Sequence, residues 1–381
     1  GRHMLIFSWF MVILFLIIGV VNGITPYYSR LGTPFGVTVP TSHQKDPYVL
    51  KLKKAYFYQN VIGSILLAAP IFFFLFWEDG EKVEMVTSIY VTVAMFAFIF
   101  LSFLLYLQKR KQIRSWKIAT DIKIEPKKAK IVIDTAYQKD LKAVSHSVFV
   151  SAQLFILLVT VAVALYFYDL IPERFPVHWN SSNEPDRIVD KTYVNVFMLP
   201  AIQLLMIPMM FFSHYSFIKS KQKISPYLSD LSSKQSKLFR QAWSYYFLIV
   251  TVLTQLLLSG IHFFSLFFAD KGAQWIIGMT IPFVVIIVGY SVYLTWKYGQ
   301  GGEKLFLNEA GELPDEVTET DEERFWKWGV LYYNPEDPSL FVEKRFGIGS
   351  TLNMARWQAW LFIAGLLAFV VLTIVLSFMM E

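Results

Sequence analysis

Eight apolar stretches recur along the chain, and each is long enough to cross a lipid bilayer. A hydrocarbon core needs about 20 residues of apolar helix, within a range of about 17–25. Each stretch is essentially free of charged residues, which argues against eight buried helices of a water-soluble protein. The pattern predicts an all-α polytopic membrane protein with about eight transmembrane helices, at residues 5–21, 57–77, 85–107, 147–168, 194–213, 243–268, 275–296 and 357–379.

The segments between the predicted spans differ in character. Residues 297–356 are dense in aromatic residues, with proline and glycine at turn spacing, so we expect a short β-rich or irregular lobe there. Residues 122–133 alternate with period two, as a β-hairpin does, and the acidic run at 316–323 predicts a flexible or helical linker. These differences divide the chain into units at 1–146, 147–213 with an outer loop at 169–193, 214–296, 297–356 and 357–381.

Composition and charge agree with a membrane protein and add an orientation. The chain is 55% hydrophobic and 17% charged, whereas soluble chains are about 45–50% apolar and about 25% charged. Of its 35 Lys and Arg residues, 29 lie in four alternate loops. Basic loops stay on the cytoplasmic side, so we expect a multi-pass protein of the cell membrane with both termini outside. The net charge of +6 is then a topology signal, and we expect the lipid bilayer, and no nucleic acid, as a partner.

The residue types that are missing exclude several chemistries. The chain contains no cysteine, which excludes disulfides, cysteine-ligated metals and a cysteine nucleophile. The predicted spans contain no Asp, Glu, Lys or Arg, which argues against ion-coupled transport through a membrane carboxylate. Known catalytic motifs are also missing, so we expect no catalytic residues, no cofactor and no resident metal. An enzyme is disfavoured, and a metal site built around His178 and Asp186 stays a minor alternative.

A few polar residues remain inside the predicted spans. Gln255, Ser259 and His262 follow one another at i, i+4 and i+7, which puts them on one face of a helix. Gln203 is a further candidate on the preceding span. Such side chains most often bond to a neighbouring helix. The alternative is that these four residues line a polar cavity within the bundle.

The outer loop carries the most specific motif in the chain. It contains Pro172, Pro176, His178, Trp179 and Asn180, followed by Pro185, Asp186 and Lys191. The prolines favour an extended backbone around Phe175, and the stretch from Asn183 to Asp186 favours a turn. The motif resembles an extracytoplasmic domain of unknown function that occurs in SdpI-type bacterial immunity and signal-transduction membrane proteins. Asn183 departs from the glycine usual in that family, but asparagine also tolerates a positive φ.

Two further stretches, on the predicted cytoplasmic side, resemble companions of that domain. One contains Phe35 and Gly36, and the other resembles a C-terminal domain of unknown function that precedes a last membrane helix. Both contain Phe-Gly followed by Val or Ile, which suggests a common structural role. Packing that caps the bundle is the simpler interpretation, and a partner-binding surface is the alternative. The candidate residues in the second stretch are Trp328, Asn334, Arg345, Gly347 and Asn353.

The resemblance implies a function that composition alone does not supply. It implies a non-enzymatic SdpI-like protein that senses, or confers immunity to, an extracellular peptide or envelope stress. Candidate partners are that peptide outside and a regulatory protein in the cytoplasm. Two alternatives stay open: a transporter or channel-like protein for a lipid, peptide or small amphipathic solute, and a membrane-embedded envelope enzyme.

Overall fold

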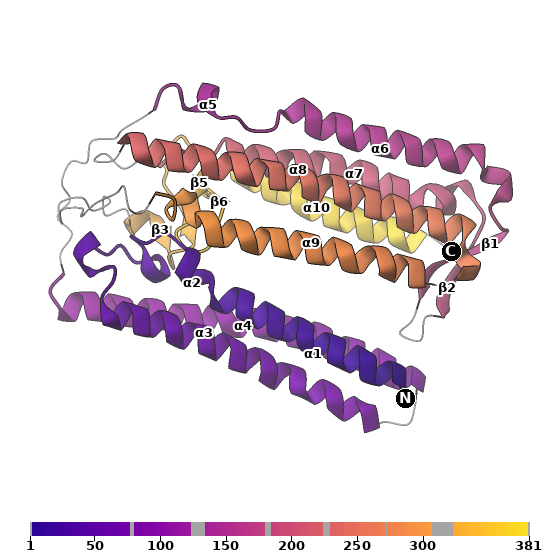
Figure 1. Ribbon diagram of the computed structural model, residues 1–381, viewed down its shortest axis with the longest axis horizontal. Coiled ribbons are helices and arrows are strands. Elements are labelled where there is room, and N and C mark those ends of the chain that lie inside the picture. The colour runs from indigo at the N-terminus through magenta and orange to yellow at the C-terminus, as the bar shows by residue number, and fades with distance from the viewer. Residues whose placement is uncertain are drawn as a thin grey trace.

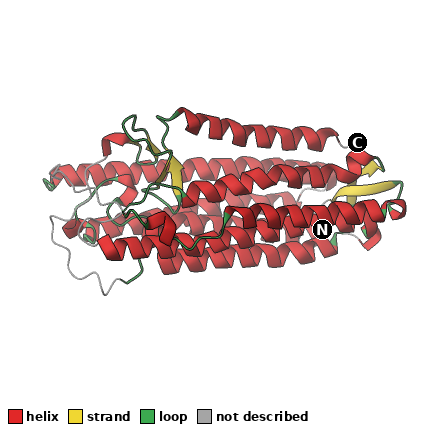
Figure 2. Cartoon of the chain, turned by 90° about the horizontal axis from the view of Figure 1, so that it is seen from above, coloured by secondary structure: helices red, strands yellow, loops and turns green. Residues whose placement is uncertain are grey.

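The computed structural model describes residues 2–76, 80–122, 134–179, 184–223, 229–271, 273–306 and 323–379. Within these ranges, eight helices are long and apolar enough to cross a membrane. They run along the longest axis of the molecule, with loops and short strands gathered at its two ends (Figure 1, Figure 2). The predicted all-α polytopic fold with small strand-containing lobes is confirmed.

A first bundle contains three of the long helices: α1 (Arg2–Gly23), α3 (Pro47–Ala68) and α4 (Gly80–Ala119). The short α2 (Thr25–Tyr28) follows α1, and η3 (Ala69–Phe76) continues α3. Helices α1 and α3 approach closely because α1 carries glycine at the contact. A Cβ on Gly23 would lie 3.1 Å from the Cα of Phe57. Small residues at helix interfaces allow such close packing in membranes.

A second bundle contains the other five long helices: α6 (His146–Tyr166), α7 (Tyr193–Ile218), α8 (Ser229–Phe267), α9 (Gln274–Tyr298) and α10 (Trp357–Met379). Helix α8 packs on α6, α7 and α9, while α10 packs on α7. Helix α7 begins at Tyr193 because the Thr192 hydroxyl accepts a hydrogen bond from the Asn195 amide at 3.1 Å. Because α8 packs on three of the other helices, it lies at the centre of the second bundle.

Three helices extend beyond the spans that hydropathy predicts. Helix α3 begins at Pro47 because the Asp46 carboxylate caps it, accepting from the Tyr48 amide at 2.8 Å, and proline suits a first turn. Helix α4 continues to Ala119 and α8 begins at Ser229. Hydropathy marks only the part of a helix that suits lipid, whereas backbone hydrogen bonding and packing continue past it.

Short strands lie at both ends of the molecule. At one end, β1 (Arg174–Trp179) pairs antiparallel with β2 (Pro185–Asp190). We call this the hairpin end, and both chain termini lie there (Figure 1). The opposite, lobe end contains residues 24–46 and two strand pairs: β3 (Trp326–Lys327) with β4 (Leu331–Tyr332), and β5 (Phe341–Glu343) with β6 (Ser350–Leu352). The hairpin predicted at 122–133 and the acidic run at 316–323 fall outside the described residues, except for Ile122 and Glu323.

Candidate functional site

The hairpin is anchored on one face and open on the other. Its inner face buries Phe175 and Val189 against α6, α7 and α8. Neighbouring residues of a strand point to opposite faces, and His178 lies on the outer one. Its Nδ1 is 2.6 Å from Asp186 Oδ1, and the two side chains are 67% and 41% exposed. Exposed ion pairs contribute little to stability, so the hairpin does not depend on this pair. Its exposed atoms are free to contact a ligand.

Most of the other predicted residues of this loop lie in or beside the hairpin. The Lys191 ammonium lies 4.6 Å from the centre of the Tyr168 ring, a cation–π contact. The Trp179 indole Nε1 is buried and has no hydrogen-bond partner within the described chain. The remaining members are Pro172, exposed before β1, Pro176, buried within β1, and Asn180, outside the described residues.

The four candidates for a cavity lining belong to a buried polar column in the second bundle. Gln255 Nε2 donates to Gln153 Oε1 at 3.0 Å. Gln203 Nε2 donates to Gln255 Oε1 at 3.2 Å and to Ser259 Oγ at 2.9 Å. His262 Nε2 lies 2.7 Å from a backbone carbonyl of α7. The column therefore ties α6, α7 and α8 together through their polar side chains.

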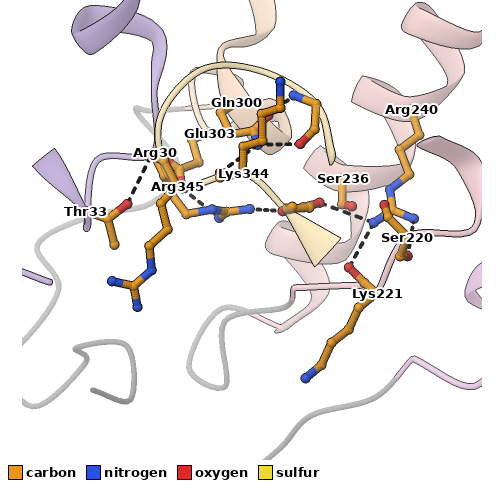
Figure 3. Close-up of polar contacts among 12 residues, drawn as sticks. Arg30, Thr33, Ser220, Lys221, Ser236, Arg240, Gln300, Glu303, Lys344 and Arg345 are labelled. Carbon is orange, nitrogen blue, oxygen red and sulfur yellow. Dashed lines mark hydrogen bonds and ion pairs between the residues drawn. The ribbon is translucent and has the colours of Figure 1, made fainter. Parts of the chain in front are cut away.

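At the lobe end, a chain of ion pairs joins both bundles to the lobe (Figure 3). Arg30, which follows α2, pairs with Glu303 at 2.8 Å and also with Glu343 of β5. Arg240 of α8 pairs with Glu343 at 3.2 Å. The side chains of Arg30, Arg240 and Glu343 are only 8%, 1% and 5% exposed. We call Arg30, Arg240, Glu303 and Glu343 the clasp, because they connect elements from both bundles.

Arg240 also satisfies the end of a neighbouring helix. Its guanidinium donates to the carbonyls of Ile218 and Ser220 at 3.1 and 2.9 Å. The last carbonyls of a helix have no partner within the helix, and a cation there is favourable. The sequence patterns above do not single out Arg240. Its signal is a lone cation between the aromatic residues Phe239 and Trp243, on a helix that continues out of the apolar segment.

Two predicted motifs of the lobe end meet backbone to backbone. Phe35 and Gly36 have φ of 48° and 76°, and Trp328 and Gly329 have φ of 54° and 72°. A Cβ on Gly36 would lie 2.7 Å from the Gly329 Cα, so both glycines are required by the close approach. The Arg345 guanidinium donates to the Gly36 carbonyl at 3.1 Å. These residues attach the lobe to the first bundle.

The two Phe-Gly sequences also lie together. The rings of Phe35 and Phe346 are stacked at 6.0 Å, and Tyr106 lies 4.5 Å from Phe346. Gly347 has a φ of 93°, and its amide donates to the Ser29 hydroxyl at 2.7 Å. Each Phe-Gly dipeptide thus supplies one aromatic ring and one turn to the contact between Phe35 and Phe346.

Asn353 organises the lobe from within. Its side chain is buried, donates to three carbonyls and accepts from two amides. The carbonyls belong to Asn334, Asp337 and Ser339, and the amides to Asn334 and Ala355. A buried amide that satisfies this many backbone groups fixes loop geometry. Asn334 and Asn353 are therefore framework residues of the lobe.

Acidification should destabilise the lobe through Asp337. Burial raises the pKa of this carboxyl, but hydrogen bonds from the Ser339 amide, the Tyr332 hydroxyl and Lys221 outweigh burial and lower the pKa below 3.8. A lowered folded-state pKa stabilises the protein above the unfolded pKa, and this stability is lost as pH falls through the folded pKa. Asp337→Asn should therefore cost about 1.5 kcal/mol at pH 7 and should lose less additional stability than the wild type at pH 3.

The measurement is unfolding in detergent at both pH values, monitored by circular dichroism. Asp270→Asn is the control, because Asp270 is an exposed carboxylate at the hairpin end. An Asp337→Asn variant that keeps the full acid sensitivity of the wild type contradicts the assignment.

The described residues contain no group of three or more His, Asp or Glu side chains placed to hold a metal ion. Two stretches of the chain match described families. Residues 155–204, which include the hairpin, match the family "Domain of unknown function (DUF1648)". Residues 335–360, which include β5 and β6, match "Family of unknown function (DUF5808)". No curated protein and no solved structure matches the chain.

These matches overlap the two stretches whose motifs resemble domains of unknown function. This is a multi-span membrane protein with two such domains. The first match includes the exposed His178–Asp186 pair, and the second includes Glu343 of the clasp. The two ends of the molecule are therefore the candidate functional sites.

Proposed function

We propose that this protein is an SdpI-like bacterial membrane protein that senses, or confers immunity to, an extracellular peptide. In this proposal the hairpin end faces outward and binds the peptide, while the lobe end engages a regulatory protein in the cytoplasm. The excess of Lys and Arg in the loops of the lobe end supports this orientation. The match of the hairpin segment to a domain of unknown function is consistent with it.

The observation that carries the proposal is the continuity of α8 between the two ends. At the hairpin end, Leu266 of α8 packs in one cluster with Phe175 of β1. At the lobe end, Arg240 of the same helix belongs to the clasp. The helix has 39 residues, about 58 Å at 1.5 Å per residue. A displacement of the hairpin can therefore reach the clasp through one rigid element.

Replacing His178 tests the receiving surface. We expect a bacterium sensitive to a secreted antimicrobial peptide to gain at least fourfold in minimal inhibitory concentration when it expresses the wild type, and to lose this gain with His178→Ala. The reason is that His178 is exposed and paired with Asp186, so its loss removes a binding group and leaves the buried face of the hairpin intact.

The matched control is Arg174→Ala, which breaks another exposed ion pair of the same hairpin, with Asp190. It should keep full protection. A cysteine introduced at Glu184 reports the side of the membrane by labelling with an impermeant maleimide, since the chain has no other cysteine. Protection that survives His178→Ala, or no protection by the wild type against any peptide tested, refutes the proposal.

The transport alternative has less support from the geometry. A transporter needs polar side chains that face a path for its solute. Gln153, Gln203 and Gln255 are buried and bond to one another. Their arrangement favours a role in holding α6, α7 and α8 together, which suits a sensor with a rigid core.

A further inference from the structure

In the described chain, the ion pairs and hydrogen bonds that connect the two bundles lie at the lobe end. Helices α1, α3 and α4 pack with one another, and so do α6 to α10, while the extensive contacts between long helices stay within each bundle in the described chain. The clasp and the lobe connect the two bundles there (Figure 1, Figure 3). From there towards the hairpin end, both bundles carry exposed apolar side chains.

Helices α1 and α9 are drawn next to each other, one from each bundle (Figure 1). The segments that follow these helices are in contact, because the Lys304 ammonium lies 3.6 Å from the centre of the ring of Tyr28, the last residue of α2. Glu303 accepts from the Leu31 amide at 2.9 Å in the same region. Each helix carries a stripe of exposed apolar residues at helical spacing: Phe10, Ile13, Ile17 and Val21 on α1, and Ile277, Ile281, Val285 and Val292 on α9.

Two lysines lie at the lobe end, one in each bundle. Lys53 of α3 is only 6% exposed, and within the described chain its ammonium forms no hydrogen bond and no ion pair. It lies near Lys304 and Glu303 of the opposite bundle. Burial lowers the pKa of Lys304, and the like charge of Lys53 lowers it further. The two cations, one from each bundle, therefore lie close enough to repel each other.

The carboxylates around these lysines are already engaged. Glu303 accepts from Arg30 at 2.8 Å, and Glu343 binds both Arg30 and Arg240. Lys53 and Lys304 thus remain as excess positive charge where little water is available. A largely buried cation is costly unless an anion pairs with it. The site calls for a negatively charged group that approaches along the exposed apolar residues of α1 and α9.

We propose that an anionic phospholipid binds between the two bundles, with its phosphate on Lys53 and Lys304 and its acyl chains along α1 and α9. The positive pair matches the phosphate, and the exposed apolar stripes match the chains. Acyl chains fill an apolar surface of this kind without requiring a hydrogen bond from it. This lipid site does not depend on the proposed peptide-sensing function.

Native mass spectrometry of the purified, delipidated protein in neutral detergent tests this site. The probes are palmitoyl-oleoyl phosphatidylglycerol, the matching phosphatidylcholine, and inorganic phosphate. We expect one phosphatidylglycerol to bind the wild type tightly, and Lys53→Gln/Lys304→Gln to weaken binding about 30-fold, from about 1 kcal/mol for each basic residue near a membrane surface. Phosphatidylcholine should bind the wild type and this variant equally weakly.

The matched control is Lys51→Gln/Lys54→Gln, which removes the same charge from exposed positions of the same helix. It should change phosphatidylglycerol binding less than threefold. The single variant Lys304→Gln, expected to weaken binding about fivefold, keeps the test informative if the double variant misfolds. The proposal is overturned if the control loses as much as the test variant, if phosphatidylcholine binds as tightly, if inorganic phosphate alone occupies the site and displaces the lipid, or if a lipid-free dimer covers α1 and α9.

Discussion

Replacing Glu343 with alanine is expected to lower the free energy of unfolding by about 3–5 kcal/mol. Glu343 is the shared partner of Arg30 and Arg240, and all three side chains are nearly buried. Removing it leaves Arg240 without a carboxylate in surroundings that hydrate it poorly. The cost of an unpaired buried charge exceeds the net value of the ion pair itself. Unfolding in detergent, followed by circular dichroism, measures the change.

The control for this experiment is Glu336→Ala, since Glu336 is exposed on the same lobe. It should stay within about 0.5 kcal/mol of the wild type. The double variant Arg240→Met/Glu343→Leu removes both charges and leaves Arg30 paired with Glu303. It should recover at least half of the loss, because apolar residues often replace a buried ion pair without cost. A loss below about 1 kcal/mol for Glu343→Ala contradicts the importance of the clasp.

Gly302→Ala should have an effect of similar size for a steric reason. Gly302 lies in η6 (Gln300–Gly302), which packs on α8. Its φ is +77°, and a Cβ would lie 2.9 Å from the Gln235 carbonyl carbon and closer still to the oxygen. A positive φ costs a residue with a side chain about 1–2 kcal/mol, and a clash with helix backbone costs about 1–3 more. We expect a total loss of about 2–5 kcal/mol in the same unfolding assay.

Two other glycines distinguish the cost of a positive φ from the cost of a steric clash. Gly349 has a φ of +110°, and no atom of the described chain lies within 4 Å of the place that a Cβ would take, so Gly349→Ala should show the strain alone. Gly289 is in the interior of α9 and is also in open space. Gly289→Ala should cost nothing, because alanine favours a helix by about 1 kcal/mol over glycine. If Gly302→Ala is no worse than Gly349→Ala, close packing between η6 and α8 is not the cause.

The number and order of the membrane helices could be predicted from the sequence because lipid imposes one simple requirement on them. A stretch such as 357–379 must be apolar throughout, and this is visible without tertiary information. The ends of α4 and α8 could not be predicted in this way. The part of α4 after residue 107 and the part of α8 before residue 243 are rich in polar residues. They are helical because one face of each part packs on the lobe and the loops, as Ile113 and Phe239 do.

The candidate sites differ in how far the sequence reveals them. His178 and Asp186 could be singled out because they belong to a compact local motif, and their pairing spans only eight residues. Arg30 and Glu343 are 313 residues apart, and each alone resembles an ordinary charge near a membrane surface. Their pairing depends on how two bundles come together, which no local pattern specifies. Lys53 is hidden in the same way, among the exposed Lys51 and Lys54.

Because the described contacts between the two bundles lie at the lobe end, each bundle extends from the clasp as a lever arm. Helix α9 has 25 residues, a lever arm of about 37 Å from the clasp. A rotation of about 5° at the clasp displaces the far end of such an arm by about 3 Å. The position of the hairpin end of α9 is thus set by an angle fixed at the lobe end. A small change of that angle therefore moves the hairpin end of α9 without any contact being made there.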